Sequence, residues 1–286
     1  MIFRTRFAPS PTGPLHVGHA YSALLAHRMA RDVGGQFLLR IEDIDQTRAR
    51  AKWIAQIKED LTWLGVAWDA QPLLQSQNLQ LYSSALDDLW ARGLLYECHC
   101  NRRDIINALS APQEGAPVGP DGLIYPGTCR TTSKLHQSAR PHEVLRLNLS
   151  KALKTIEEPL NFMEIGIGPN RQTGLQTLTS TELMKTVGDI VLARRGMGTS
   201  YHLSVVVDDA AQGITHVVRG QDLFEATAIH VVLQKLLRLP SPKYHHHRLI
   251  RDENGVRLAK RDNAKAVALM RAQGKTVADI RMMIGA

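Results

Sequence analysis

Two histidines lie three residues apart at the start of a predicted helix, in the sequence His16-Val17-Gly18-His19. Side chains at this spacing share one helix face, and the free N–H groups of a helix N-terminus favour phosphate. Gly18 has no side chain, so a planar base or ribose could approach the backbone there. Both imidazoles could then stabilise negative charge that grows on a phosphorus centre. Taken alone, the pair could also be capping or surface histidines, or half of a zinc site.

A basic cluster, Arg257-Leu258-Ala259-Lys260-Arg261, lies near the other end of the chain. Cations at such a position can stabilise a leaving pyrophosphate more in the transition state than in the ground state. Taken alone, the cluster could equally be a solvated basic turn. Together with the two histidines it could hold a triphosphate from two sides, which is typical of enzymes that activate a carboxylate as an adenylate.

Charged residues follow two of the predicted strands. Glu42 and Asp43 come directly after the strand 36–41, where the carboxyl ends of parallel strands open onto a ligand crevice. One of them could neutralise an ammonium group, although a capping or surface pair is the alternative. Arg219 follows the strand 214–218 and by itself indicates a surface ion-pair partner.

Cysteine occurs only three times, as Cys98, Cys100 and Cys129. An odd number argues against a disulfide framework, and the clustering favours a metal over buried cysteines that act as small hydrophobes. A structural zinc site needs four donors, so His99, Tyr125 or water could fill the fourth position. By contrast, we expect 245–247, three consecutive histidines, to form a solvent-exposed turn, because adjacent side chains cannot all face one ion.

The composition is that of an ordinary globular enzyme, with 44% hydrophobic and 22% charged residues among 286. The net charge of +8 suits a polyanionic partner such as nucleic acid, or simply solubility. No apolar run approaches the roughly 20 residues that span a bilayer, and the N-terminus lacks the pattern of a signal peptide. We therefore expect a cytoplasmic protein that does not bind membranes.

The order of predicted elements indicates an α/β fold. Strands at 2–7 and 36–41 alternate with helices at 17–33, 51–64 and 79–92, which predicts the start of a doubly wound parallel sheet. Strands are also predicted at 142–148, 189–192, 203–209 and 214–218, and helices at 226–237, 267–272 and 277–284. We divide the chain into a first Rossmann half (1–95), an inserted module (96–187), a second Rossmann half (188–240) and a basic-loop and short helical region (241–286).

The string from Pro9 to His19 resembles the HIGH-type signature of class I aminoacyl-tRNA synthetases in their glutamyl form. The resemblance extends to 40–45, 201–209 and 214–220, in family order, and covers essentially the whole chain. It implies a Rossmann-type catalytic domain with an inserted zinc module. The basic cluster occupies the place of the KMSKS loop. It departs from the commoner Lys-Leu-Ser-Lys-Arg form at Arg257 and Ala259, but it keeps Lys260.

The resemblance also assigns roles to residues. The implied catalytic residues are His16, His19 and Lys260. The implied ATP-binding residues are His16, Gly18, His19, Arg257 and Lys260, with Mg²⁺ accompanying the ATP. The implied glutamate-binding residues are Arg6, Ala8, Ser10, Glu42, Tyr201 and Arg219. One structural zinc per chain is implied on Cys98, Cys100, Tyr125 and Cys129, because the sequence from Tyr125 to Arg130 matches the family form.

The chain is shorter than a conventional glutamyl-tRNA synthetase. Only 25 residues follow Arg261, which cannot form an anticodon-binding domain. The chain is therefore most similar to the truncated glutamyl-queuosine tRNA(Asp) synthetases, which ester-link glutamate to the queuosine base at the wobble position of tRNA(Asp). Gln221 weakly favours this group, and we expect a monomer. The alternatives are an enzyme that charges a tRNA 3′ end, or a silent RNA-binding paralogue.

Overall fold

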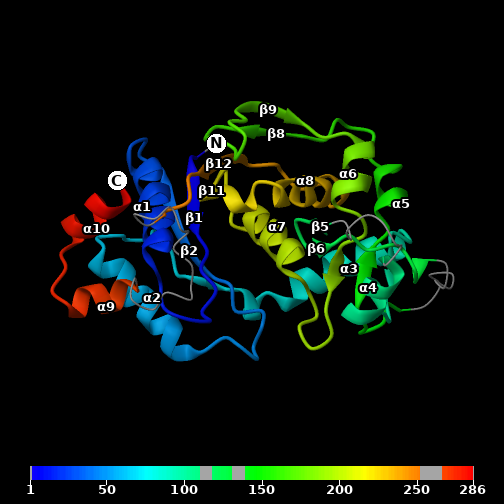
Figure 1. Cartoon of the computed structure of the whole chain (residues 1–286), viewed down its shortest axis with the longest axis horizontal. Coiled ribbons are helices and arrows are strands. Elements are labelled where there is room, and N and C mark those ends of the chain that lie inside the picture. The colour runs from blue at the N-terminus through cyan, green and yellow to red at the C-terminus, as the bar shows by residue number, and fades with distance from the viewer. Residues whose placement is uncertain (1, 110–117, 131–138, 252–265, 286) are drawn as a thin grey trace.

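The computed structural model describes residues 2–109, 118–130, 139–251 and 266–285, and it begins with parallel β-α-β units (Figure 1). The first elements are β1 (Arg4–Phe7), α1 (Val17–Arg31), β2 (Gln36–Ile41), α2 (Ala51–Trp63), β3 (Leu73–Leu74) and α3 (Leu79–Ala91). β2 pairs in parallel with both β1 and β3. Nearly every residue of β1 and β2 is buried, as expected for parallel strands covered on both faces.

A second sheet continues the first. Its strands are β8 (Asn161–Glu164), β9 (Gly174–Thr177), β11 (His216–Gly220) and β12 (Lys243–His247). The helices of this part of the chain are α7 (Tyr201–Ala211) and α8 (Ala226–Leu236). β12 pairs in parallel with β11 and β8, whereas β9 is antiparallel to β8. The N–H of Thr215 donates to the carbonyl of Arg4 (3.0 Å), so β11 runs beside β1. The strand order β3-β2-β1-β11-β12-β8 is that of the predicted doubly wound sheet, and its direction of winding changes between β1 and β11.

The chain between α3 and α7 adds a third group of elements. These are β4 (Leu95–Glu97), α4 (Arg102–Leu109), β5 (Val118–Gly119), β6 (Gly122–Leu123), β7 (Leu145–Leu147), α5 (Leu149–Leu153), α6 (Ser180–Thr186) and β10 (Val191–Ala193). β7 pairs antiparallel with β4 and β10 in a small sheet. β8 and β9 also belong to this part of the sequence, but they pair within the second sheet. The predicted domain limits stay predictions.

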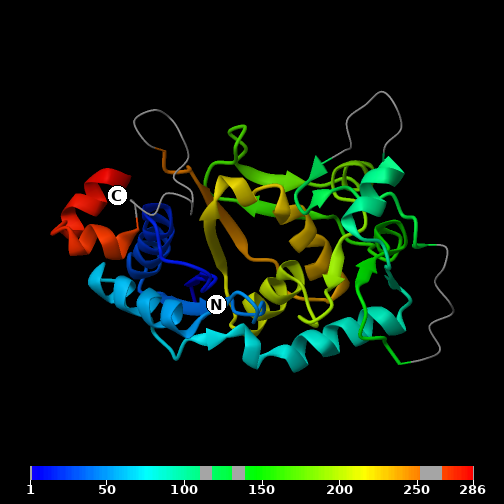
Figure 2. The same ribbon diagram turned by 60° about the horizontal axis from the view of Figure 1, so that its bottom comes forward.

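Two short helices, α9 (Val267–Ala272) and α10 (Val277–Ile284), complete the described chain where the sequence predicts them. Their buried residues share one hydrophobic cluster with α1 and α2. Figure 2 shows these helices at the opposite end of the molecule from α4 and β7. No helix in the described part of the chain is both long and apolar enough to cross a membrane.

Two sequence predictions of local structure are wrong. Residues 203–209 form most of helix α7 rather than a strand; Ser200 caps this helix by accepting from the N–H of Leu203 (3.4 Å). The helix is buried nearly all round, which removes the polar face that would have revealed a helical period. The three histidines form the end of β12, and His246 and His247 are buried because β12 lies between β11 and β8.

Candidate active site

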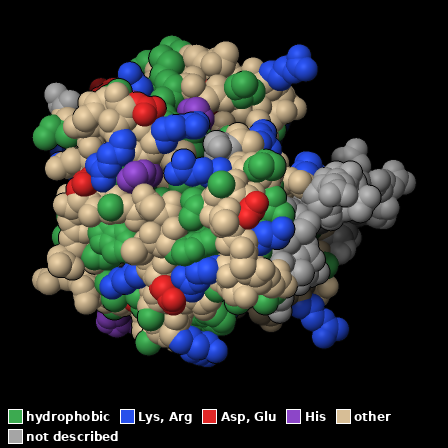
Figure 3. Space-filling model, turned by 90° about the vertical axis from the view of Figure 1, so that its left-hand side faces the viewer, with side chains coloured by type: hydrophobic (Ala, Val, Ile, Leu, Met, Phe, Trp, Pro, Cys, Tyr) green, Lys and Arg blue, Asp and Glu red, His purple; other side chains and the backbone are tan. Residues whose placement is uncertain are grey.

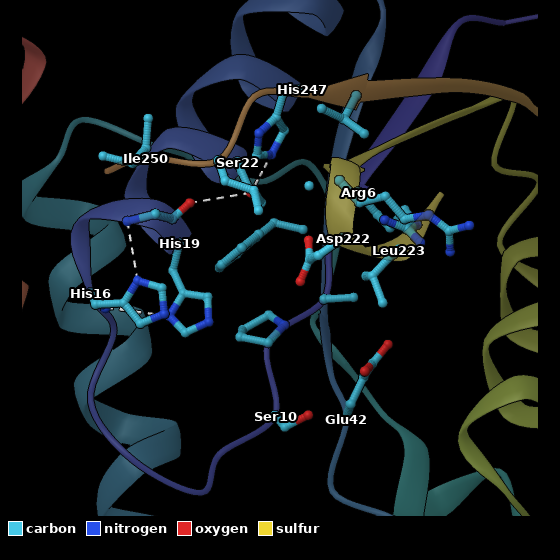
Figure 4. Close-up of a pocket in the computed structure, with 18 of the residues that line it drawn as sticks. Arg6, Ser10, His16, His19, Ser22, Glu42, Asp222, Leu223, His247 and Ile250 are labelled. Atoms are coloured by element: carbon cyan, nitrogen blue, oxygen red, sulfur yellow. Dashed lines mark hydrogen bonds between the residues drawn. The ribbon is translucent and has the colours of Figure 1, made fainter. Parts of the chain in front are cut away.

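A cavity of about 320 Å³ opens at the carboxyl ends of the parallel strands, where β1 meets β11 (Figure 4). This is the position at which open α/β sheets bind ligands. The structure brings together in its lining every predicted glutamate- or ATP-binding residue that it describes: Arg6, Ala8, Ser10, His16, Gly18, His19, Glu42, Tyr201 and Arg219. The predicted Arg257 and Lys260 lie outside the described residues.

His16 and His19 form the start of α1. The Nδ1 atom of His16 accepts from the N–H of Gly18 (3.1 Å), and the Nδ1 atom of His19 accepts from the N–H of His16 (3.3 Å). Their rings are stacked with centroids 3.7 Å apart, side by side on one wall of the cavity (Figure 4). Because Nδ1 is the acceptor in each ring, a neutral imidazole carries its proton on Nε2 and can donate from there. A Cβ on Gly18 would lie 3.0 Å from the His16 ring, so glycine suits this turn.

The segments on either side of residues 252–265 both reach this wall. Ile250 lines the cavity. On the other side, Ala266 forms a β-bridge with His16, and the N–H of Val267 donates to the carbonyl of Leu15 (2.8 Å). The described chain before residue 252 and after residue 265 therefore lies beside the start of α1.

Sequence reasoning missed a hydrogen-bonded pair on the same wall, Ser22 and His247, 2.6 Å apart (Figure 4). The Nδ1–H of His247 donates to the carbonyl of Arg248 (2.9 Å), which leaves Nε2 to accept from the Ser22 hydroxyl. Burial lowers the pKa of His247 to about 4, so the ring is neutral at pH 7. His247 points into the cavity from the end of β12. The sequence does not predict this contact, because three consecutive histidines do not show which one faces the cavity.

Glu42 lies across the cavity from the histidines (Figure 4), and its carboxyl has a raised pKa. Burial raises its pKa to about 7, although Arg40 and Arg6 act in the opposite direction. The nearest cation is Arg40, whose Nη2 lies 3.6 Å from the carboxylate. A carboxylate that is only partly compensated, 9% exposed and open to a cavity can bind an ammonium group.

Two acidic residues of α7 lie beside the cations around Glu42, and Asp208 is 3.9 Å from Nε of Arg40. Asp209 accepts from Arg6 (3.0 Å) and Arg40 (2.7 Å), and these guanidinium groups lower its pKa although burial opposes ionisation. Asp208 accepts hydrogen bonds from the hydroxyl of Tyr82 and from two amide side chains. The family resemblance at 201–209 includes both aspartates, but the sequence predicted no role for them. Two acidic residues in an otherwise apolar run were the available signal.

Arg219 is buried and not at the surface, which corrects its interpretation from the residue alone as a surface ion-pair partner. Its guanidinium donates to His246 (3.1 Å), His230 (3.1 Å) and Thr227 (2.8 Å). All three acceptors are neutral groups. Beside it, burial and the charge of Glu42 raise the pKa of Tyr201, so that the Tyr201 hydroxyl stays protonated.

The three cysteines converge outside this cavity, with their sulfur atoms all within 4.8 Å of one another. The sulfur of Cys100 lies 3.4 Å from that of Cys129 and 3.3 Å from the hydroxyl of Tyr125. The side chain of His99 is 65% exposed. The three cysteines could therefore hold a metal ion, and the hydroxyl of Tyr125 lies close enough to Cys100 to offer a fourth donor.

The surface formed by α1, α2, α9 and α10 carries scattered Lys and Arg side chains and few acidic ones (Figure 3). A pocket between α1 and α10 is lined by Arg28, Arg31 and Arg281 together with Leu24, Leu25, His27 and Asp32, and Arg31 is paired with Asp69 (2.8 Å). Basic side chains therefore outnumber acidic ones on this face.

Comparison with known proteins identifies the family. The family described as class I tRNA synthetases (E and Q), catalytic domain, matches residues 2–284. A glutamyl-Q tRNA(Asp) synthetase of Rhodobacter capsulatus is 58% identical, with 98% of this chain and 99% of the relative covered. One of Albidiferax ferrireducens is 43% identical, with coverage of 92% and 85%.

Solved structures agree with this grouping. A glutamate-tRNA synthetase from Elizabethkingia anophelis superimposes with a TM-score of 0.71 at 26% identity. The match covers 93% of this chain but 54% of that synthetase, so the chain spans about half of its length. The chain belongs to the glutamyl-Q tRNA(Asp) synthetase family of class I aminoacyl-tRNA synthetases, and it is a ligase of that class.

Proposed function

We propose that this protein activates L-glutamate with ATP·Mg²⁺ to glutamyl-adenylate and transfers the glutamate to the queuosine base of tRNA(Asp). The observation that carries the proposal is one cavity with a carboxylate that is 9% exposed, a buried arginine without a charged partner among the described residues, and stacked histidines at a helix N-terminus. These groups complement an ammonium, a carboxylate and a phosphate, respectively.

Glutamate occupies the part of the cavity next to β1 and β11. Glu42 binds its α-ammonium group, and the cations Arg6 and Arg219 face its carboxylates. Arg6 is already paired with Asp209, so Arg219 supplies the larger share of uncompensated positive charge. Ala8, Ser10 and Tyr201 complete this subsite.

ATP lies along the start of α1. His16 and His19 donate from Nε2 to the phosphate oxygens, and the missing side chain of Gly18 leaves room for the nucleotide. An oxygen of the glutamate α-carboxylate attacks the α-phosphorus, and pyrophosphate leaves. Arg257 and Lys260 join the histidines in stabilising the charge that moves onto the phosphates.

In the second step, a hydroxyl of the queuosine base attacks the acyl carbon of glutamyl-adenylate. An ester forms and AMP leaves, without a covalent enzyme intermediate. The basic face in Figure 3 suits the phosphate backbone of the tRNA. We expect the protein to act as a cytoplasmic monomer.

Cys98, Cys100, Tyr125 and Cys129 would hold one zinc ion. Bound zinc supplies a structural cross-link, because the site lies outside the cavity and offers four protein donors. The donors lie before α4 and after β6, so the cross-link would hold these two segments together.

Two measurements test the function. Purified protein should exchange labelled pyrophosphate into ATP with glutamate present and without tRNA. RNA glutamylated by the protein is then digested, and mass spectrometry identifies the nucleoside that carries glutamate. Label on queuosine supports the proposal. Label on a 3′-terminal adenosine would instead assign ordinary tRNA charging, and failure to bind ATP would indicate a silent RNA-binding paralogue.

A further inference from the structure

The acceptors around Arg219 differ from those of the other two buried arginines near the cavity. Arg6 and Arg40 both donate to the carboxylate of Asp209, which neutralises much of their charge. Arg219 donates three hydrogen bonds to neutral acceptors, and no carboxylate of the described residues lies within ion-pair distance of it. A guanidinium carries five N–H groups, so two are left for a ligand.

One of these acceptors, His246, can accept from Arg219 only in one tautomer. Its Nε2 faces the guanidinium (3.1 Å), so its proton must sit on Nδ1. Nδ1 lies 2.5 Å from a carboxylate oxygen of Glu164, which accepts that proton. Burial lowers the pKa of His246 and keeps the ring neutral, while Glu164 acts in the opposite direction and Arg219 and His245 act in the same one.

The second histidine acceptor of Arg219 repeats the arrangement. The Nδ1 atom of His230 accepts from Arg219, so Nε2–H of His230 donates to Nδ1 of His202 (3.2 Å). The other ring nitrogen of His202 faces a carboxylate oxygen of Asp121 (3.5 Å). Burial lowers the pKa of His230 well below its ordinary value. Each histidine that touches Arg219 is therefore neutral, and a carboxylate lies at the far end of each chain.

We infer that Glu164 is a positioning residue: through His246 it holds the guanidinium of Arg219 in place without neutralising its charge. Asp121 does the same through His202 and His230. A carboxylate placed directly on Arg219 would fix the guanidinium equally well, but it would cancel the charge that attracts the substrate. The inference rests on the proposed binding of glutamate at Arg219.

Substitution Glu164→Gln tests the inference because the site dictates how the amide must lie. One carboxylate oxygen of Glu164 accepts from the backbone N–H groups of His246 (3.0 Å) and Gly166 (2.7 Å). The amide oxygen must stay there, so the NH₂ group faces Nδ1 of His246. The ring proton then moves to Nε2, where it meets the N–H of Arg219.

We expect E164Q to raise the KM for glutamate on the order of tenfold in pyrophosphate exchange, with the KM for ATP unchanged. Nitrogen-15 NMR should show the proton of His246 move from Nδ1 to Nε2, with the His246 signals assigned by their loss in H246Q. A glutamine side chain has no ring tautomer, so adding E164Q to H246Q should change the KM by less than about twofold. E157Q, at an exposed glutamate, is the matched control.

D121N tests the other branch without disturbing a fully buried residue, and it should raise the KM for glutamate by a smaller factor. An unchanged tautomer in E164Q, or equal rises in the KM for glutamate and for ATP, would overturn the inference. The NMR readout needs no substrate. If the His246 tautomer changes in E164Q but the native protein shows no glutamate-dependent exchange, the proposed function is refuted. The hydrogen-bond chain from Glu164 to Arg219 would still be supported.

Discussion

Substitution Glu42→Gln should weaken glutamate binding and yet stabilise the protein. The substitution keeps the size of the side chain and removes its charge. Removing a charged hydrogen-bond partner from the glutamate ammonium costs about 2–3 kcal/mol, which corresponds to a rise of about 30- to 150-fold in the KM for glutamate. The KM for ATP should stay within about twofold, because Glu42 lies across the cavity from the start of α1.

The gain in stability follows from the raised pKa of Glu42. A carboxyl whose pKa is about 7 when folded, and 4.5 ordinarily, is destabilising in its ionised form. This loss begins near pH 4.5 as the unfolded chain ionises, and it is complete above about pH 7, at about 3 kcal/mol. E42Q should therefore melt several degrees higher than the native protein at pH 8, with a much smaller difference at pH 5.

Pyrophosphate exchange and thermal melting, each measured at several pH values, test both effects. In the native protein the KM for glutamate should rise as the pH falls through about 7, because Glu42 then takes up a proton. In E42Q this pH dependence should be absent. E157Q serves as the control, since Glu157 is exposed. A lower melting temperature of E42Q at pH 8 would refute the reasoning, as would a KM for ATP that rises as much as the KM for glutamate.

Three further substitutions probe other parts of the site. R219K keeps the charge but loses the planar fork, and it should raise the KM for glutamate at least tenfold in the exchange assay without changing the KM for ATP. H16A should lose the cap of α1 and about 1 kcal/mol of unfolding free energy in denaturant titrations, whereas H16N should recover stability but not the exchange rate. C129S should bind much less zinc than the native one ion per chain by elemental analysis and should melt earlier; equal zinc content in both proteins would contradict the ligand assignment.

Much of the fold could be predicted from the sequence because its signals are local. Between the helix predicted at 17–33 and the strand predicted at 36–41 the sequence has Gly34-Gly35, which is typical of a helix end. The structure has α1 and β2 there. The described residues that the resemblance assigns to glutamate and ATP also line one cavity, whereas Arg257 and Lys260 lie outside the described residues. Helix α7 was missed because burial on almost every side erased its polar face.

The supporting residues could not be predicted, because their partners are distant in sequence. Asp209 lies 203 positions from Arg6 and 169 from Arg40, and Glu164 lies 82 positions from His246. No periodicity or spacing connects such pairs. The triple histidine shows the difficulty most clearly: its residues are ordinary in composition, and only the central place of β12 in the sheet turns His246 and His247 into buried hydrogen-bond partners.

The distribution of charge explains why these distant partners matter. The two cations that act on Glu42, Arg40 and Arg6, are both also paired with Asp209. Arg219 has only neutral acceptors among the described residues. The cavity therefore contains a negative and a positive group whose charges are each incompletely compensated by the protein, and this arrangement lowers the stability of the fold. A zwitterionic amino acid with an additional carboxylate compensates both at once. Direct ion pairs at Glu42 and Arg219 would make the protein more stable, but they would remove the driving force for binding glutamate.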